Sequence, residues 1–223
     1  MSDDAESAAK VVARLKAGGI ESLRARLMNE PPVLPLVATR GDFDLNPHTR
    51  PLNRKELRPA AVLVPLVQRP EPTVLLTQRT HTLAQHAGQV AFPGGRAEPH
   101  DVSLIQTALR ETEEETGIQS SFITIAGFLD AYETGTGFAI LPVVGLLAEG
   151  FALMPDASEV AEVFEVPLAF LLDPRNHHHE TAIQRGRLRR YWAVPYGERY
   201  IWGATAGMLV AFQRILAGGA AGG

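Results

Sequence analysis

Apolar side chains form two patterns along this chain. In the first, they recur at every third and fourth position, which predicts helices that bury one face. This spacing is found in residues 4–28, where Gly18-Gly19 interrupts it, and in residues 101–117 and 203–216. Short, continuous apolar runs between turn residues predict buried strands instead. Such runs occupy residues 60–67, 73–78, 122–129 and 138–147. Strands that alternate with helices in this order predict an α/β fold.

The helix predicted in residues 101–117 has signals at both of its ends. Asp101 is expected to be its N-cap, since a carboxylate accepts from the free N–H groups of a first helical turn. Gly117 is expected to end the helix in a left-handed conformation. Just before the helix, Pro93-Gly94-Gly95 predicts a chain reversal, because proline fixes φ and glycine tolerates a positive φ.

Three glutamates of this helix share one face. Residues three and four apart lie together, so Glu111, Glu114 and Glu115 fall within an arc of about 100°, whereas Glu113 points to solvent. Like charges in such positions repel by roughly a few tenths of a kcal/mol per pair when exposed. Arg110 neutralises part of this charge, and a hard divalent cation, which prefers carboxylate oxygens, would neutralise the rest. A solvated helix face is the alternative interpretation of a charge run.

The order of residues in this segment resembles the core of a known motif. Arg110-Glu111-Thr112-Glu113-Glu114-Glu115-Thr116-Gly117-Ile118 is similar to the second half of the Nudix box, Arg-Glu-U-x-Glu-Glu-x-Gly-U, in which U is apolar. The first half of the box departs by one extra residue. Its acidic position falls on Asp101 when counted forward from Gly95, and on Val102 when counted back from Arg110.

A second motif lies upstream of the first. Leu75-Leu76-Thr77-Gln78-Arg79-Thr80, followed by His86-Ala87-Gly88-Gln89-Val90-Ala91-Phe92-Pro93-Gly94-Gly95, resembles the signature that precedes the box in the coenzyme A diphosphatase branch of Nudix hydrolases. Thr80 stands where that branch has serine or alanine. The two motifs together cover about 45 residues, and they are specific.

The resemblance implies the Nudix fold, a mixed β-sheet sandwiched between α-helices, here with an N-terminal helical extension. A helical arm and a proline-rich linker are expected in residues 1–57, the Nudix domain in residues 58–217, and a disordered tail in residues 218–223. The implied metal ligands, for Mg²⁺ or Mn²⁺, are Glu111, Glu114 and Glu115. The implied catalytic residues are Glu114, Glu111 and Arg110. The implied substrate-binding residues are Arg79, Gly94 and Gly95.

The activity implied by the resemblance is hydrolysis of the diphosphate of coenzyme A, or of a derivative, to 3′,5′-ADP and 4′-phosphopantetheine or its acyl form. One alternative is a Nudix hydrolase of another nucleoside diphosphate, such as ADP-ribose or a dinucleotide. Another is a non-catalytic Nudix module that senses a nucleotide. The intact Glu111, Glu114 and Glu115 argue against a silent module, and the Leu-Leu-Thr-x-Arg motif favours coenzyme A over ADP-ribose.

Composition excludes several classes of function. A net charge of −4 argues against a general nucleic-acid-binding protein, which is usually basic. The absence of cysteine excludes disulfides, thiolate zinc sites and a cysteine nucleophile. No run approaches the roughly 18 apolar residues of a membrane-spanning helix, and the acidic N-terminus does not resemble a signal peptide. A cytoplasmic protein that acts on a small-molecule nucleotide is therefore expected, with monomer and homodimer both left open.

A few other polar residues are weaker candidates. Glu159 and Glu162 lie in a region from which Nudix enzymes often draw a further metal ligand or base, although a solvated loop acid is the alternative. His177-His178-His179 is expected in a surface loop, since consecutive side chains rarely converge on one metal ion. Residues 185–190 are expected to form a charged hairpin, with contact to a nucleotide as the alternative.

Overall fold

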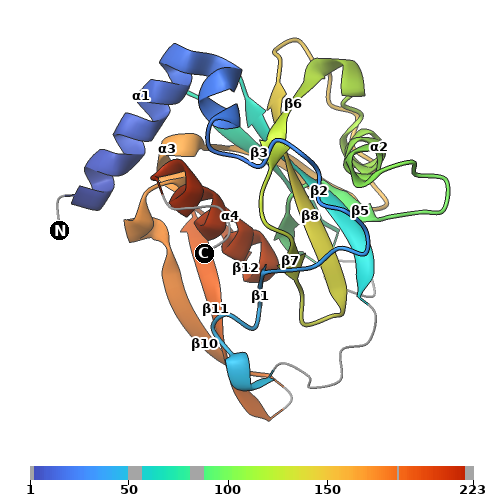
Figure 1. Ribbon diagram of the computed structural model, residues 1–223, viewed down its shortest axis with the longest axis vertical. Helices are drawn as coiled ribbons and strands as arrows, with labels where there is room; N and C mark the ends of the chain where they lie inside the picture. Colours follow the sequence, from blue (N-terminus) through green and yellow to red (C-terminus); the bar gives the residue numbers. More distant parts are fainter. Residues whose placement is uncertain (1–2, 50–56, 81–87, 185, 219–223) are drawn as a thin grey trace.

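The computed structural model of the protein describes residues 3–49, 57–80, 88–184 and 186–218. Its described strands form a large mixed sheet and a small antiparallel one (Figure 1). The strands of the large sheet are β1 (Arg40–Gly41), β2 (Arg58–Val67), β3 (Thr73–Arg79), β4 (Val90–Ala91), β5 (Gly94–Arg96), β6 (Ile123–Phe128), β7 (Tyr132–Glu133), β8 (Phe138–Leu147) and β9 (Val160–Pro167). The strands of the small sheet are β10 (His178–Gln184), β11 (Arg187–Tyr196) and β12 (Arg199–Trp202).

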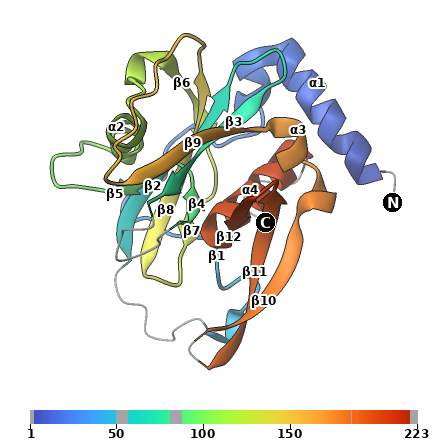
Figure 2. The ribbon, with the colours of Figure 1, turned by 180° about the vertical axis from the view of Figure 1, so that it is seen from behind.

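Helices cover the sheets on both sides (Figures 1 and 2). The α-helices are α1 (Asp3–Arg24), α2 (Leu104–Thr116), α3 (Leu168–Leu171) and α4 (Gly203–Leu216). Short 3₁₀ turns are η1 (Pro47–Thr49), η2 (Ser120–Phe122) and η3 (Pro174–Asn176). No helix in the described part of the chain is long and apolar enough to cross a membrane.

The centre of the large sheet is the parallel pair of β2 and β8, in which Arg58 lies opposite Phe138 and Val67 opposite Leu147. Apart from Arg58 at the start of β2, both strands are apolar because both of their faces are covered. Ala61 and Leu63 pack on the side of α2, whereas Val62 and Val64 belong to the cluster that contains α1, α3 and α4. The strand predicted in residues 138–147 is thereby confirmed, as is the mixed sheet between helices.

Helix α1 carries its apolar stripe into this second cluster through Ala8, Val11, Val12 and Leu15. It is kinked at Gly19, which has φ 52° and ψ −140°, as the interrupted apolar spacing predicts. The Arg14 side chain donates a hydrogen bond of 2.7 Å to the carbonyl of Leu216 in the last turn of α4. Carbonyls of a last helical turn lack partners within the helix, so the first helix of the chain caps the final one.

The small sheet lies against α4 at one end of the molecule (Figure 2). Its β10–β11 hairpin confirms the hairpin predicted around residues 185–190. The loop predicted for the three histidines is confirmed for His177 and is wrong for His178 and His179, which belong to β10 and pair with Ala193 and Trp192. The His179 ring packs on Trp192, with centroids 3.7 Å apart. The position of these histidines is therefore set by the pairing of β10 with β11, which the local sequence does not reveal. His81, His86 and the tail from residue 219 lie outside the described residues.

Candidate active site

Helix α2 begins at a different cap from the one predicted. Ser103 is the N-cap, and its hydroxyl accepts from the backbone N–H of Gln106 at 3.2 Å. Asp101 is not the cap, because its carboxylate is engaged in other bonds. The prediction for the other end is confirmed, since Gly117 has φ 77° and donates its N–H to the carbonyl of Glu113 at 2.8 Å.

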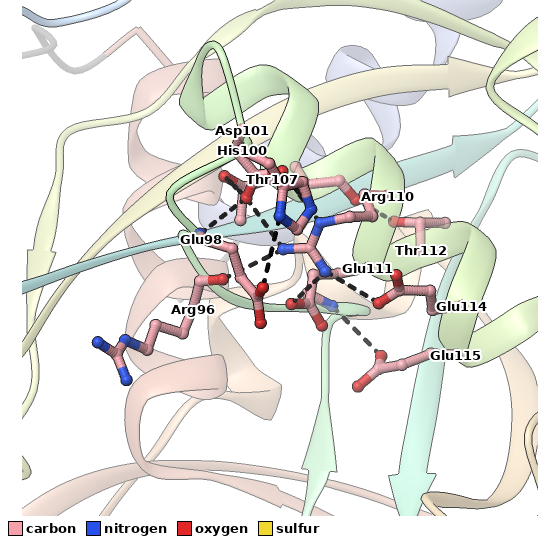
Figure 3. Close-up of polar contacts among 12 residues, drawn as sticks. Arg96, Glu98, His100, Asp101, Thr107, Arg110, Glu111, Thr112, Glu114 and Glu115 are labelled. Atoms are coloured by element: carbon pink, nitrogen blue, oxygen red, sulfur yellow. Dashed lines mark hydrogen bonds and ion pairs between the residues drawn. The ribbon is translucent and has the colours of Figure 1, made fainter.

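Asp101 instead holds Arg110 (Figure 3). The Nε and Nη2 of Arg110 donate to the two carboxylate oxygens of Asp101, each at 3.0 Å. The Thr107 hydroxyl and the backbone N–H of Glu98 also donate to Asp101, both at 2.9 Å. The bonds from Arg110 hold the pKa of Asp101 well below its usual range. One extra residue in the first half of the box thus places a buried carboxylate behind the arginine.

The opposite edge of the Arg110 guanidinium faces the glutamates. Its Nη1 lies 3.0 Å from the Oε1 of Glu111 and 2.9 Å from the Oε2 of Glu114. A guanidinium has five N–H donors in a fixed plane, and here it joins three carboxylates at once. Figure 3 shows Asp101 on one side of Arg110 and the three glutamates on the other. Arg110 therefore fixes the direction in which Glu111 and Glu114 point.

Glu115 is the most deeply buried of the three glutamates, with 5% of its surface exposed. Its Oε2 accepts from the backbone N–H of Gly94 at 3.2 Å, and its Oε1 lies 3.4 Å from the Nη1 of Arg79. Burial raises its pKa to about 8, although the Gly94 N–H and the Arg79 charge act in the opposite direction. A buried carboxylate with such a pKa lacks sufficient positive charge around it.

The glycines before α2 allow close approach as well as the predicted chain reversal, since β4 pairs antiparallel with β3 and β5 pairs antiparallel with β2, so the chain changes direction between β4 and β5. Gly94 and Gly95 belong to β5 and pair with Val62 and Ala61 of β2. A Cβ on Gly95 would lie 2.4 Å from the Oε2 of Glu111, and one on Gly94 would lie 2.4 Å from the carbonyl of Ala61. Only glycine leaves this room, so the backbone of β5 forms a wall directly beneath the glutamates.

Glu111 rests on that wall and is half-buried. Burial raises its pKa, and the negative charges of Glu114 and Glu159 raise it further, while Arg110 lowers it. Glu111 and Glu115 therefore both place negative charge in a partly desolvated environment that holds more acidic than basic charge. Glu114 is more open, with 59% of its side chain exposed, and Glu113 points into solvent as predicted.

Arg79 and Glu159 complete the cluster. The Nη2 of Arg79 lies 3.7 Å from the Oε2 of Glu159, and the charge of Glu159 acts on both Glu111 and Glu115. Pairing of β3 with β9, in which Arg79 lies opposite Val160, brings these residues together. Glu162, the other candidate, forms an ion pair with Arg199 of β12 instead. The geometry thus separates two acids that the sequence treats alike.

The side chains of Glu111, Glu114 and Glu115 suit a hard divalent cation, because such a cation prefers carboxylate oxygens as ligands. In the described residues, no group of three acidic or histidine side chains already has the arrangement of a metal site. Arg110 engages Glu111 and Glu114, and Arg79 engages Glu115. A cation bound here would take the place of these arginine contacts on some of the oxygens.

A model of the NUDIX domain matches residues 57–186, which is more than half of the chain. The chain belongs to the Nudix family. A Nudix hydrolase named NudL from Photorhabdus laumondii is 46% identical over 149 residues, which cover 67% of this chain and 80% of that protein. A NudL from Escherichia coli O1:K1 is 43% identical over 160 residues, which cover 71% and 83%.

A solved MutT/nudix family protein from Enterococcus faecalis is similar with a TM-score of 0.47 and 20% identity, over 78% of this chain and 68% of that one. So low a likeness adds no argument to the family match. As a Nudix hydrolase, the protein is an enzyme that hydrolyses phosphoric anhydrides of nucleoside diphosphate derivatives. Enzymes of this family generally use divalent metal ions. The roles of individual side chains in the site stay predictions.

Proposed function

We propose that this Nudix hydrolase cleaves the diphosphate of coenzyme A or its derivatives, yielding 3′,5′-ADP and 4′-phosphopantetheine or its acyl form. The observation that supports this substrate is the contact between Arg79 and Glu115. Arg79 belongs to the upstream motif that resembles the coenzyme A branch, and Glu115 belongs to the Nudix box. The two motifs are 36 residues apart at this contact, yet they contribute to one cluster of side chains.

The proposed cofactor is Mg²⁺ or Mn²⁺, held by Glu111, Glu114 and Glu115. When bound, such a cation neutralises phosphoryl oxygens and lowers the pKa of a coordinated water. The protein supports this site through the Asp101–Arg110 pair, which orients the carboxylates of Glu111 and Glu114. It also includes the high pKa of Glu115, which favours uptake of positive charge at that position.

The remaining groups act on the substrate and on the water. Arg79 can present a planar pair of N–H donors to a phosphate, the geometry in which guanidinium binds oxyanions best. Gly94 and Gly95 allow the substrate to approach the backbone of β5. Glu114, the most exposed of the box glutamates, is the proposed acceptor of the water proton, and Glu159 is the second candidate for that role.

The test is product analysis after incubation with Mg²⁺ or Mn²⁺ and, in parallel, with coenzyme A, ADP-ribose and a diadenosine polyphosphate. We expect 3′,5′-ADP from coenzyme A, loss of this product in Glu115→Gln, and retention in Glu113→Gln, the matched control on the exposed side of α2. Cleavage of only one of the other two substrates would refute the coenzyme A assignment. Nucleotide binding without cleavage of any substrate would favour the sensor module. The cytoplasmic location and the homodimer stay predictions.

A further inference from the structure

A cavity of about 550 Å³ lies between the β1–β7 edge of the large sheet and the small sheet. None of the three box glutamates lines it, so it is distinct from the cluster around Arg110. Its volume lies within the roughly 300–1,000 Å³ that is usual for small-molecule sites. Its walls combine aromatic rings with arginines, a pairing that the proposed catalytic groups do not use.

The aromatic wall is one face of the small sheet. Ala193 of β11 lies opposite Trp202 and Pro195 lies opposite Tyr200, and side chains alternate along a strand, so Tyr191, Trp202 and Tyr200 share that face. The Tyr191 and Trp202 rings meet edge to face with centroids 5.5 Å apart. The hydroxyls of Tyr191 and Tyr200 lie 3.4 Å apart. Tyr200 is still 43% exposed, which leaves ring surface on which a base can stack.

Two arginines of β11 border this aromatic wall. Arg189 lies two residues before Tyr191 and hence on the same face of the strand. Its Nη1 lies 3.4 Å from the position that a Cβ of Gly135 would take. The backbone of Arg190 is clamped by Asn46, which accepts from its N–H at 2.8 Å and donates to its carbonyl at 2.7 Å. Arg189 thus borders the cavity on a strand that is fixed in place.

Among the described residues that line the cavity, the one acid, Asp42, already has hydrogen-bond partners. Its carboxylate accepts from the Tyr132 hydroxyl at 2.9 Å and from the Gly135 N–H at 2.7 Å. Burial raises its pKa, although those two hydrogen bonds and the charge of Arg189 act against the rise. Hydrogen bonds from Tyr132 and Gly135 and the charge of Arg189 partly balance the negative charge of Asp42, which reduces its repulsion of an anionic ligand.

Strand β5, which lies beneath the glutamates, is three strands away from the cavity wall. The carbonyl of Arg96 in β5 accepts from the Nη2 of Arg110 at 3.3 Å. Across the large sheet, Arg96 pairs with Ala60, Ala60 with Ile140 and Ile140 with Tyr132 in the cavity wall. Three strand spacings of about 4.8 Å give a separation of about 14 Å between Arg96 and Tyr132.

A second chain of contacts, through α4 and β4, gives a separation of similar size between the cavity and β5. The Thr205 hydroxyl near the start of α4 donates to the carbonyl of Val90 in β4 at 3.1 Å, and Gly203 two residues earlier lines the cavity. From Val90 the chain runs four residues to Gly94, whose N–H holds Glu115, and at about 3.3 Å per residue this segment spans at most about 13 Å. One substrate can therefore reach both places.

We propose that this cavity binds the purine nucleoside half of the substrate. The base stacks on the Tyr191, Trp202 and Tyr200 face, and the 3′-phosphate meets Arg189, while the diphosphate lies at the glutamates. Stacking rings and guanidinium forks suit a phosphorylated nucleoside, whereas the amide chain of a pantetheine offers neither a ring nor a charge beyond the diphosphate. The assignment of the 3′-phosphate rests on the proposed function.

The chain carries its own reporter of binding, because its two tryptophans, Trp192 and Trp202, both line the cavity. Intrinsic fluorescence of the metal-free protein is therefore titrated with 3′,5′-ADP, 5′-AMP and 4′-phosphopantetheine, none of which needs to be hydrolysed. We expect a saturable change with both nucleotides, at least about tenfold tighter for 3′,5′-ADP because an arginine–phosphate contact is added. No change is expected with 4′-phosphopantetheine.

Two variants separate the roles of the base and the phosphate. Arg189→Gln should weaken 3′,5′-ADP by about tenfold and leave 5′-AMP unchanged, since it removes a charge-assisted contact to the 3′-phosphate alone. Tyr200→Ala should weaken both nucleotides by about tenfold, because stacking does not depend on the phosphate. The control is Arg175→Gln, an exposed arginine paired with Asp173 outside the cavity. Circular dichroism checks that each variant is folded.

The result is compared with hydrolysis of coenzyme A by the wild-type enzyme with Mg²⁺. The cavity proposal is overturned if coenzyme A is cut but 3′,5′-ADP leaves the fluorescence unchanged, or if Arg189→Gln behaves like Arg175→Gln. If coenzyme A is not cut while the nucleotides bind with the expected pattern, the cavity proposal stands and the proposed function fails. A fluorescence change with 4′-phosphopantetheine and not with the nucleotides would place the other half of the substrate here, and would overturn the assignment.

Discussion

Ionisation of Glu115 in the metal-free enzyme should weaken the fold, and the size of this effect follows from its burial. The pKa of the side chain is raised from the ordinary 4.5 to about 8 because the carboxylate is buried between Gly94, Arg79 and the rest of α2. At about 1.36 kcal/mol per pH unit, this difference corresponds to about 5 kcal/mol. That is a large part of the 5–15 kcal/mol by which a domain is typically stable.

The direction of the pH dependence follows from proton binding. Folded Glu115 binds its proton more tightly than unfolded Glu115 does, so this contribution to stability is fully present below about pH 4.5 and is lost as the pH rises to about 8. Glu115→Gln has a neutral side chain of the same shape at every pH. We expect the two proteins to be similar in stability below about pH 4.5, and the variant to be more stable by up to about 5 kcal/mol above about pH 8.

The measurement is urea denaturation of both proteins across this pH range in the presence of a chelator. Glu113→Gln is the control, since Glu113 is exposed on the same helix and its replacement should leave the pH dependence as in the wild type. A stability difference between wild type and Glu115→Gln that stays constant with pH would refute the reasoning. Saturating Mg²⁺ should raise the stability of the wild type, because a ligand that binds only the folded state stabilises it, and should raise that of Glu115→Gln less.

Three further predictions concern the surroundings of the glutamates. Asp101→Asn should lower kcat by roughly 10–100-fold and raise the Mg²⁺ concentration needed for half-maximal activity, because it frees Arg110; steady-state kinetics at several Mg²⁺ concentrations checks this. Gly94→Ala should cost about 1–3 kcal/mol of stability by overpacking, because its Cβ would lie 2.4 Å from the backbone carbonyl of Ala61, whereas Gly135→Ala, whose Cβ would have contacts no closer than 3.4 Å, should cost little in thermal denaturation. Ser103→Ala should cost about 1 kcal/mol through loss of the cap, and a circular dichroism melt that matches the wild type would contradict this.

Much of the fold could be predicted because its central elements are buried on both sides. The bounds of the strand in residues 138–147 were predicted correctly, since a continuous apolar run is typical of a strand that is buried on both faces of an α/β sheet. The face formed by Glu111, Glu114 and Glu115 was also predicted, because helical spacing fixes which side chains neighbour each other. In both cases the information is local, within a single element.

The parts that were missed depend on contacts between distant segments. Glu159 and Glu162 look alike in sequence, and only the pairing of β9 with β3 and the position of β12 send one to Arg79 and the other to Arg199. Asp101 was predicted to be a cap because acids are good caps, but a bidentate bond to Arg110 is the stronger interaction for a buried carboxylate. The extra residue in the first half of the box was the available signal.

The hydrogen bond from Arg14 to the carbonyl of Leu216 has a consequence for the order in which the chain folds. It joins positions that are 202 residues apart, and the entropic cost of closing such a loop must be met before the contact contributes. The first helix therefore docks late, after the central strands have paired, and its apolar stripe stays open to water until then. Unfolding should begin with its release, so protection against hydrogen exchange should be lost in α1 before it is lost in β2 and β8.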